Sequence, residues 1–194
     1  MTAEPSQRPD VLERNLALQA RILPTPLLTP AKTAQALHGA IRSHLIRAAN
    51  DGILASSIAE IHKHLRLHRT SEGFTIYGAR LECANFRRNP TDPHFTREDG
   101  AWFDFLISGR SVDADRLEIV AYNCELRLPE AITGLPRFLR LDLNLPGHRN
   151  EASGLRCHIH PGHDDLQVPA PFMHPLDIVD FCVYGVTWPE KLRS

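Results

Sequence analysis

Residues 116–128 read RLEIVAYNCELRL and alternate apolar with polar side chains over most of their length. The apolar alternate positions are Val120, Tyr122, Cys124 and Leu126. The polar alternate positions are Asn123, Glu125 and Arg127. Because successive side chains leave a strand on opposite faces, this pattern predicts a long strand with one apolar and one polar face.

Two later segments repeat the same alternation. Residues 137–145 (RFLRLDLNL) place leucines on one face and Arg140, Asp142 and Asn144 on the other. Residues 155–160 (LRCHIH) separate Leu155, Cys157 and Ile159 from Arg156, His158 and His160. Residues 73–86 and 101–107 are also predicted strands. Since the connections between neighbouring segments are short, we expect an antiparallel meander.

The chain outside these segments is predicted to be mostly helical. A short helix over residues 11–22 is followed by prolines at 24, 26 and 30, which favour extended backbone. A helix capped by Thr29, with Pro30 in its first turn, should end at residues 50–52. A second helix follows to residue 69, and a last one over residues 176–184 begins after Pro175 and ends at Gly185.

These elements predict an α+β fold in which N-terminal helices precede an antiparallel β-meander and a C-terminal helix packs on the sheet. The expected organisation is a lead-in at residues 1–30, a helical hairpin at 31–69 and a sheet with its helix at 70–194. Residues 31–194 are expected to form one domain, as chains of this length usually do.

Composition excludes several classes of protein. The 194 residues carry a formal net charge of -1, so the chain as a whole is not a basic nucleic-acid coat. The longest uncharged, mostly apolar run, residues 22–31, contains three prolines and is too short to span a membrane. The N-terminus is polar, unlike a secretory signal. We expect a cytoplasmic protein without a membrane partner.

The four cysteines are far apart in the sequence and are predicted to be reduced core residues. They are Cys83, Cys124, Cys157 and Cys182. No Cys-x-x-Cys pair is present, which zinc ribbons and redox motifs require. Disulfides and a catalytic thiol are the alternatives, and Cys157 is the first choice for the thiol because it borders two histidines.

The candidate site lies in residues 148–165, HRNEASGLRCHIHPGHDD. Its candidate catalytic residues are His148, His158, His160 and His163. The residues expected to bind substrate on the same polar face are Arg127, Arg140, Asn144 and Arg156. His158 and His160 are two apart on a strand, so both rings should leave one face about 7 Å apart. This face uses Arg, His and Asn and contains no Lys, unlike an ordinary solvated face.

Three interpretations of this segment remain open. Two imidazoles that titrate near neutrality can move protons on a phosphodiester while Arg140 and Arg156 hold its oxygens. Alternatively, His158 and His160 bind Zn, Fe or Mn with a further ligand from His148, His163 or Asp164. In the third interpretation the histidines are structural and bond the backbone around a turn.

Other catalytic motifs are missing from the sequence. It has no Gly-x-Ser-x-Gly elbow, phosphate-binding Walker loop, Gly-x-Gly-x-x-Gly or His-Glu-x-x-His. The His-x-His strand is shared with cupins, but the Glu that follows it there is replaced by Asp164 and Asp165. Asp104 and Glu125 suggest a nuclease carboxylate pair, although Arg127 stands near Glu125 where a Lys would strengthen that interpretation.

The order of these features resembles the TumE-like toxins of bacterial toxin–antitoxin modules over about residues 73–184. The residues that carry the resemblance are RLDLNLPGH (140–148), HIHPGHDD (158–165) and PLDIVDFCVYG (175–185). The resemblance implies a small cytoplasmic toxin or defence effector that acts on RNA and is held silent by a protein partner.

We therefore expect a metal-independent endoribonuclease in which His158 or His160 is the base and the other is the acid. Residues 1–70, with 9 Lys/Arg against 5 Asp/Glu, should attract the RNA backbone. The alternatives are a non-catalytic binding or adaptor module and a His-ligated metal enzyme.

Overall fold

The computed structural model describes residues 9–78, 88–129 and 134–187. The helices among them are α1 (Pro9–Ile22), α2 (Ala34–Asn50), α3 (Ile58–His64), α4 (Arg149–Ala152) and α5 (Pro175–Asp180), which continues into a π-helix, η2 (Phe181–Gly185). The strands are β1 (Leu28–Thr29), β2 (Arg66–Arg69), β3 (Phe74–Tyr77), β4 (Phe95–Thr96), β5 (Trp102–Asp113), β6 (Arg116–Arg127), β7 (Phe138–Leu143), β8 (Cys157–Pro161) and β9 (Val168–Pro169).

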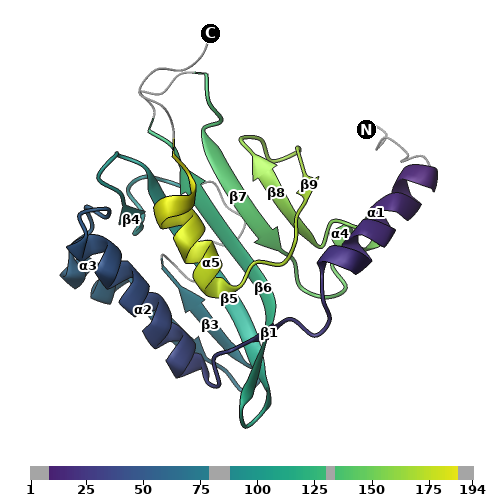
Figure 1. Ribbon diagram of the computed structural model, residues 1–194, viewed down its shortest axis with the longest axis horizontal. Helices are drawn as coiled ribbons and strands as arrows, with labels where there is room; N and C mark the ends of the chain where they lie inside the picture. Colours follow the sequence, from purple (N-terminus) through teal and green to yellow (C-terminus); the bar gives the residue numbers. More distant parts are fainter. Residues whose placement is uncertain (1–8, 79–87, 130–133, 188–194) are drawn as a thin grey trace.

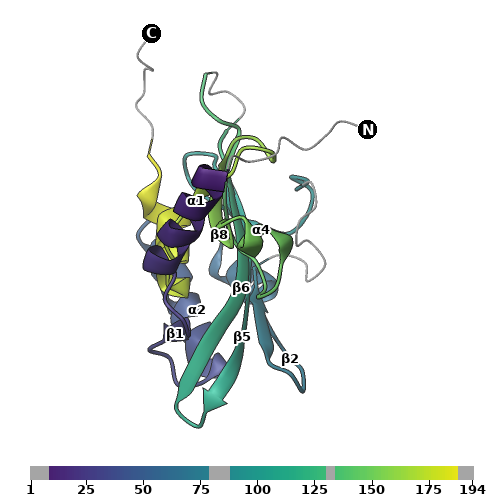
Figure 2. The ribbon, with the colours of Figure 1, turned by 90° about the vertical axis from the view of Figure 1, so that its right-hand side faces the viewer.

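The strands form one antiparallel sheet with the order β2-β3-β5-β6-β7-β8-β9. The short strands β1 and β4 pair with β6 and β5. Helices α2 and α5 lie side by side on one face of this sheet (Figures 1 and 2). The predicted α+β fold, with N-terminal helices, an antiparallel meander and a C-terminal helix on the sheet, is therefore confirmed.

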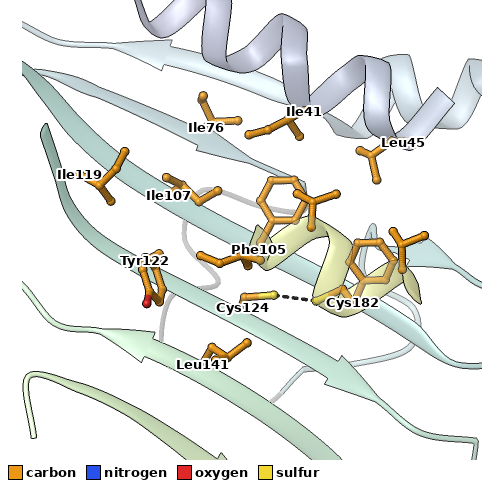
Figure 3. Close-up of a cluster of buried hydrophobic side chains, with 14 of the residues drawn as sticks. Ile41, Leu45, Ile76, Phe105, Ile107, Ile119, Tyr122, Cys124, Leu141 and Cys182 are labelled. Atoms are coloured by element: carbon orange, nitrogen blue, oxygen red, sulfur yellow. Dashed lines mark hydrogen bonds between the residues drawn. The ribbon is translucent and has the colours of Figure 1, made fainter. Parts of the chain in front are cut away.

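The core lies between the sheet and its covering helices. Leu37, Ile41, Leu45 and Ala48 repeat at helical spacing along α2 and are fully buried. Figure 3 shows Ile41 and Leu45 over the apolar face of the sheet, where Ile107 and Cys124 lie. The thiols of Cys124 and Cys182 are 3.0 Å apart, and this contact joins β6 to η2.

The start of α2 differs from the prediction. Thr29 does not cap the helix, because it pairs with Leu117 in the sheet and its hydroxyl lies 2.6 Å from His174 Nε2. The cap is Thr33, whose hydroxyl accepts a hydrogen bond from the Ala36 amide.

The predicted helical hairpin at residues 31–69 is also wrong at its end. Helix α3 begins with a capping box of Ser57 and Glu60 and ends at His64. Residues 66–69 then form β2, an edge strand that pairs with β3. Leu67 is partly buried between exposed Arg66 and His68, which fits a strand with one face toward the protein, and this pattern outweighs the helical propensity of Leu and Arg.

Three further differences concern short elements. The strand predicted at residues 101–107 is longer in the structure, since β5 continues to Asp113. Helix α4 and strand β9 span four and two residues, which is too short for a periodic pattern. The predicted strand at 73–86 is present as β3, and its residues 79–86, which include Cys83, lie outside the described ranges.

None of the described helices combines the length and apolarity that crossing a bilayer requires.

Candidate functional site

The polar face of the sheet is organised by strand register into three rows of side chains. The first row is Trp102, Arg127 and Phe138; the second is Asp104, Glu125, Arg140 and His160; the third contains Asn123, Asp142 and His158. Neighbours within a row are cross-strand partners, and successive rows are about 7 Å apart along the strands. The alternation in the sequence thus predicted correctly which side chains share a face.

This face is buried rather than solvated, which corrects the expectation of a wet polar surface. Glu125 is 1% exposed, His158 2%, His160 3% and Asp142 6%. Buried charges are costly unless they are paired, so the side chains of these rows must satisfy one another.

Arg88 joins three of these side chains at one end of the network. Its Nε lies 3.1 Å from both oxygens of Asp104, its Nη1 lies 3.4 Å from Glu125 Oε2, and its Nη2 donates to the side-chain oxygen of Asn123. Asp104 and Glu125 thus neutralise the guanidinium of Arg88 instead of holding a metal ion between them. The nuclease carboxylate pair considered from the sequence is therefore not favoured by the geometry.

Asp142 connects this network to the histidines. Its Oδ1 accepts a hydrogen bond from the Asn123 amide, and its Oδ2 lies 3.0 Å from Arg140 Nε and 3.1 Å from His160 Nε2. Burial by itself would raise the pKa of Asp142, but the hydrogen bond with His160 and the charge of Arg140 outweigh it, so the pKa lies below its ordinary value. Asp142 is therefore a carboxylate at neutral pH.

The two imidazole rings meet edge to face, with centroids 4.7 Å apart and planes at 68°, so they lie closer than the spacing of about 7 Å expected from the strand. His158 Nε2 and His160 Nε2 are 3.0 Å apart, and His158 Nε2 is 3.7 Å from Asp142 Oδ2. His158 Nδ1 lies 2.7 Å from the carbonyl oxygen of Leu155. Because a carbonyl only accepts, Nδ1 carries the proton and Nε2 presents its lone pair. Burial lowers the pKa of His158 despite the opposing charge of Asp142, so this ring is neutral at neutral pH.

Of the four histidines proposed as catalytic residues, only His158 and His160 come together. His148 and His163 are exposed and stand before and after β8. Each uses Nδ1 to accept a backbone hydrogen bond two residues along the chain, from Asn150 and Asp165. These two histidines match the structural interpretation, in which imidazoles close turns.

The residues expected to bind substrate lie in different surroundings. Arg140 bonds Asp142 and, at 2.7 Å, Asp164. Arg127 lies between the rings of Trp102 and Phe138, its guanidinium carbon 6.0 and 4.9 Å from their centroids.

The other two expected substrate residues lie near the β7–β8 connection. Arg156 donates to the carbonyl oxygens of Asn144 and Val120. Asn144 is partly buried, and its Nδ2 has no hydrogen-bond partner among the described residues. Arg156 is therefore hydrogen-bonded to backbone carbonyls, whereas Arg127 lies in the first row and Arg140 in the second.

Sequence reasoning missed Asp142 as the partner of the histidines and named His163 and Asp164 instead. In the described part of the chain, the group that brings three metal-ligating atoms within 4.8 Å of one another is Asp142, His158 and His160. The alternation had placed Asp142 on the correct face. Its pairing with His158 depends on the β7–β8 register, which the intervening loop does not specify.

Cys157 lies on the opposite face from His158 and His160, which follow it in the sequence. Its thiol contacts the Tyr122 hydroxyl at 3.2 Å and the Pro171 carbonyl oxygen at 3.3 Å. Burial raises the pKa of Cys157 to about 11, although the hydrogen bond with Tyr122 acts in the opposite direction. This position does not support a catalytic thiol assisted by the histidines.

Cys157 is accordingly expected to react slowly with thiol reagents. In native protein at pH 7.5, iodoacetamide should label it at least about 100-fold more slowly than in guanidinium, because the thiolate is both rare and shielded. Peptide mass spectrometry would resolve it from the other cysteines. Equal rates in native and denatured protein would contradict the buried placement.

Comparison with known proteins adds no assignment: no family model, curated protein or solved structure matches this chain at a significant level.

Proposed function

We propose that this protein is a hydrolase that cleaves RNA phosphodiester bonds at the cluster of Asp142, His158 and His160. The observation that carries the proposal is the convergence of two imidazoles and a carboxylate, with the side chain of His158 held in one tautomer by Leu155. Imidazoles and carboxylates are the usual groups that move protons in phosphodiester cleavage.

The neighbouring row supports a nucleic acid as the substrate. Trp102, which is partly buried, and Phe138, which is 9% exposed, flank Arg127 on the same face, and His94 packs on Trp102 with ring centroids 4.6 Å apart. Unstacked RNA bases bind on such rings, often together with an arginine plane such as that of Arg127. The row lies about 7 Å from the row that contains His160, comparable to the spacing between successive nucleotides.

Electrostatic attraction is the second source of support. Arg66, His68 and Arg69 are exposed on the edge strand β2 and belong to the basic N-terminal part of the chain. RNA binding should therefore weaken as salt concentration rises. A cytoplasmic location, a toxin-like or defence role and a neutralising protein partner complete the proposal.

The burial of the cluster sets a requirement. His158 and His160 are almost fully covered in the structure, so the proposed reaction needs the site to open when RNA binds. The same burial favours a second candidate, a non-catalytic binding module in which the histidine network only stabilises the sheet.

A cleavage assay with a matched pair of variants tests the proposal. Wild-type protein should cleave single-stranded RNA, and His158→Ala/His160→Ala should lower the rate at least about 100-fold because both proton-transfer groups are lost. The control is His148→Ala/His163→Ala, which removes two exposed histidines of the same segment and should leave the rate unchanged.

Thermal unfolding of the same proteins separates the two candidates. If no RNA is cleaved by the wild type and the His158/His160 variant only melts earlier, the binding module is the correct interpretation. Unchanged cleavage by that variant would place the reaction elsewhere. Trp102→Ala, which removes part of the aromatic row, should raise KM more than it lowers kcat.

A further inference from the structure

We infer that Asp142, His158 and His160 form a binding site for one divalent transition-metal ion. The inference rests on the cluster used in the proposed function, but it concerns what the cluster binds rather than what it cleaves. It replaces proton transfer by His158 and His160, which was expected from the sequence and used in the proposed function, with a His-ligated metal centre in which both imidazoles are ligands.

The first support is the geometry of the three ligand atoms. His158 Nε2, His160 Nε2 and Asp142 Oδ2 form a triangle with sides of 3.0, 3.1 and 3.7 Å. A point about 2.1 Å from all three atoms lies just outside the plane of this triangle, and this is the ordinary bond length from Zn²⁺ to nitrogen and carboxylate ligands.

The second support is the direction of the lone pairs. The Leu155 carbonyl fixes the proton of His158 on Nδ1, so its Nε2 aims an unprotonated nitrogen at the second imidazole. Without an ion, His160 Nε2 must supply the only proton between the two rings. Its Nδ1 is buried and has no hydrogen-bond partner among the described residues. Coordination by both Nε2 atoms would hold the two rings close together without that proton.

The third support is the set of residues behind the ligands. Metal-bound histidines usually donate their other N–H to a backbone carbonyl or carboxylate, and ligating carboxylates are themselves hydrogen-bonded. His158 donates to Leu155, while Asp142 accepts hydrogen bonds from Asn123 and Arg140. Leu155 thus orients the His158 ring, Asn123 holds the Oδ1 of Asp142, and Arg140 shares the proposed ligand oxygen Oδ2.

The ligand types define the class of ion. Two imidazoles and one carboxylate suit Zn²⁺, Fe²⁺ or Mn²⁺ and are poor ligands for Ca²⁺ or Mg²⁺, which prefer oxygen. Three protein ligands leave a coordination position for water or substrate, as in catalytic rather than structural zinc sites. An ion held there would make bound water more acidic and polarise a phosphoryl oxygen.

Metal binding by the untagged protein tests the inference without any assay of activity. After treatment with chelator and dialysis, the wild type should bind one equivalent of Zn²⁺ in calorimetry. Co²⁺ should bind with visible absorption bands and raise the Tm. Since these measurements use the wild type, they do not depend on whether a variant folds.

Variants then assign the ligands. Asp142→Asn, which keeps the side-chain volume, and His160→Ala should each weaken Zn²⁺ binding about 100-fold or more, and Asn123→Ala should weaken it about 10-fold. His148→Ala/His163→Ala should bind as the wild type does. Absence of stoichiometric binding by the wild type, or binding lost only when the exposed histidines are removed, would overturn the inference.

The outcomes for the ion and for RNA are separable. Protein that binds one ion but cleaves no RNA supports the metal site and contradicts the proposed function. Protein that cleaves RNA in excess EDTA and binds no ion does the reverse.

Discussion

Replacing Glu125 by alanine is expected to lower the free energy of unfolding by about 3–5 kcal/mol. This carboxylate is 1% exposed and lies 2.5 Å from Arg127 Nε, 3.4 Å from Arg88 Nη1 and 3.5 Å from Arg140 Nη1. Its removal leaves part of the positive charge of three arginines uncompensated in a buried region. Urea unfolding followed by circular dichroism would measure the effect.

An exposed ion pair provides the control for this experiment. Arg116 Nε lies 2.5 Å from Asp113 Oδ2, but the two side chains are 58% and 42% exposed. Arg116→Ala should lower the free energy of unfolding far less than Glu125→Ala does, because solvent screens the pair. Similar losses for Glu125→Ala and Arg116→Ala would show that the polar rows are more open to solvent than the structure has them.

Replacing Phe105, on the apolar face of the same sheet, by alanine is expected to lower the free energy of unfolding by about 3–5 kcal/mol. The Phe105 ring is 2% exposed and stacks on Phe95 with centroids 5.9 Å apart. It lies in the layer between sheet and helices shown in Figure 3. Loss of the ring leaves a cavity in the core. Because the core is closely packed, α2 and the sheet cannot readily move to fill this cavity.

Val112→Ala on the same strand is the matched control for this substitution. Val112 is 45% exposed near the end of β5, so the change should stay within about 0.5 kcal/mol. Equal effects at positions 105 and 112 would contradict the assignment of Phe105 to the core.

Periodicity predicted the fold because it reports which side of an element is apolar. Leu37, Ile41 and Leu45 are buried as the helical spacing indicated, and Cys124 and Glu125 lie on the opposite faces that alternation assigned to them. Local rules were less reliable where long-range pairing competes with them. Thr29 had the properties of a helix cap, yet its pairing with β6 places the cap at Thr33.

The sequence predicted which residues make up the candidate site, but it did not predict how they contact one another. Alternation placed His158, His160 and Arg140 together, but it could not show that these groups are buried, because burial depends on what packs over them. Arg88 joins the network from the segment between the strands predicted at 73–86 and 101–107. Turn histidines such as His163 resemble site histidines in sequence, since both occur beside Gly, Pro and Asp.

The side chains of this site come from neighbouring strands. The site can therefore bind a ligand only when these strands are aligned as in the native sheet. Asp142 stands opposite His158 only when β7 and β8 pair as they do here. A slip of one residue would send both imidazoles to the side that holds Cys157. If the site holds an ion as inferred above, titration with Co²⁺ during refolding would report when this hairpin reaches its final alignment, with no engineered probe.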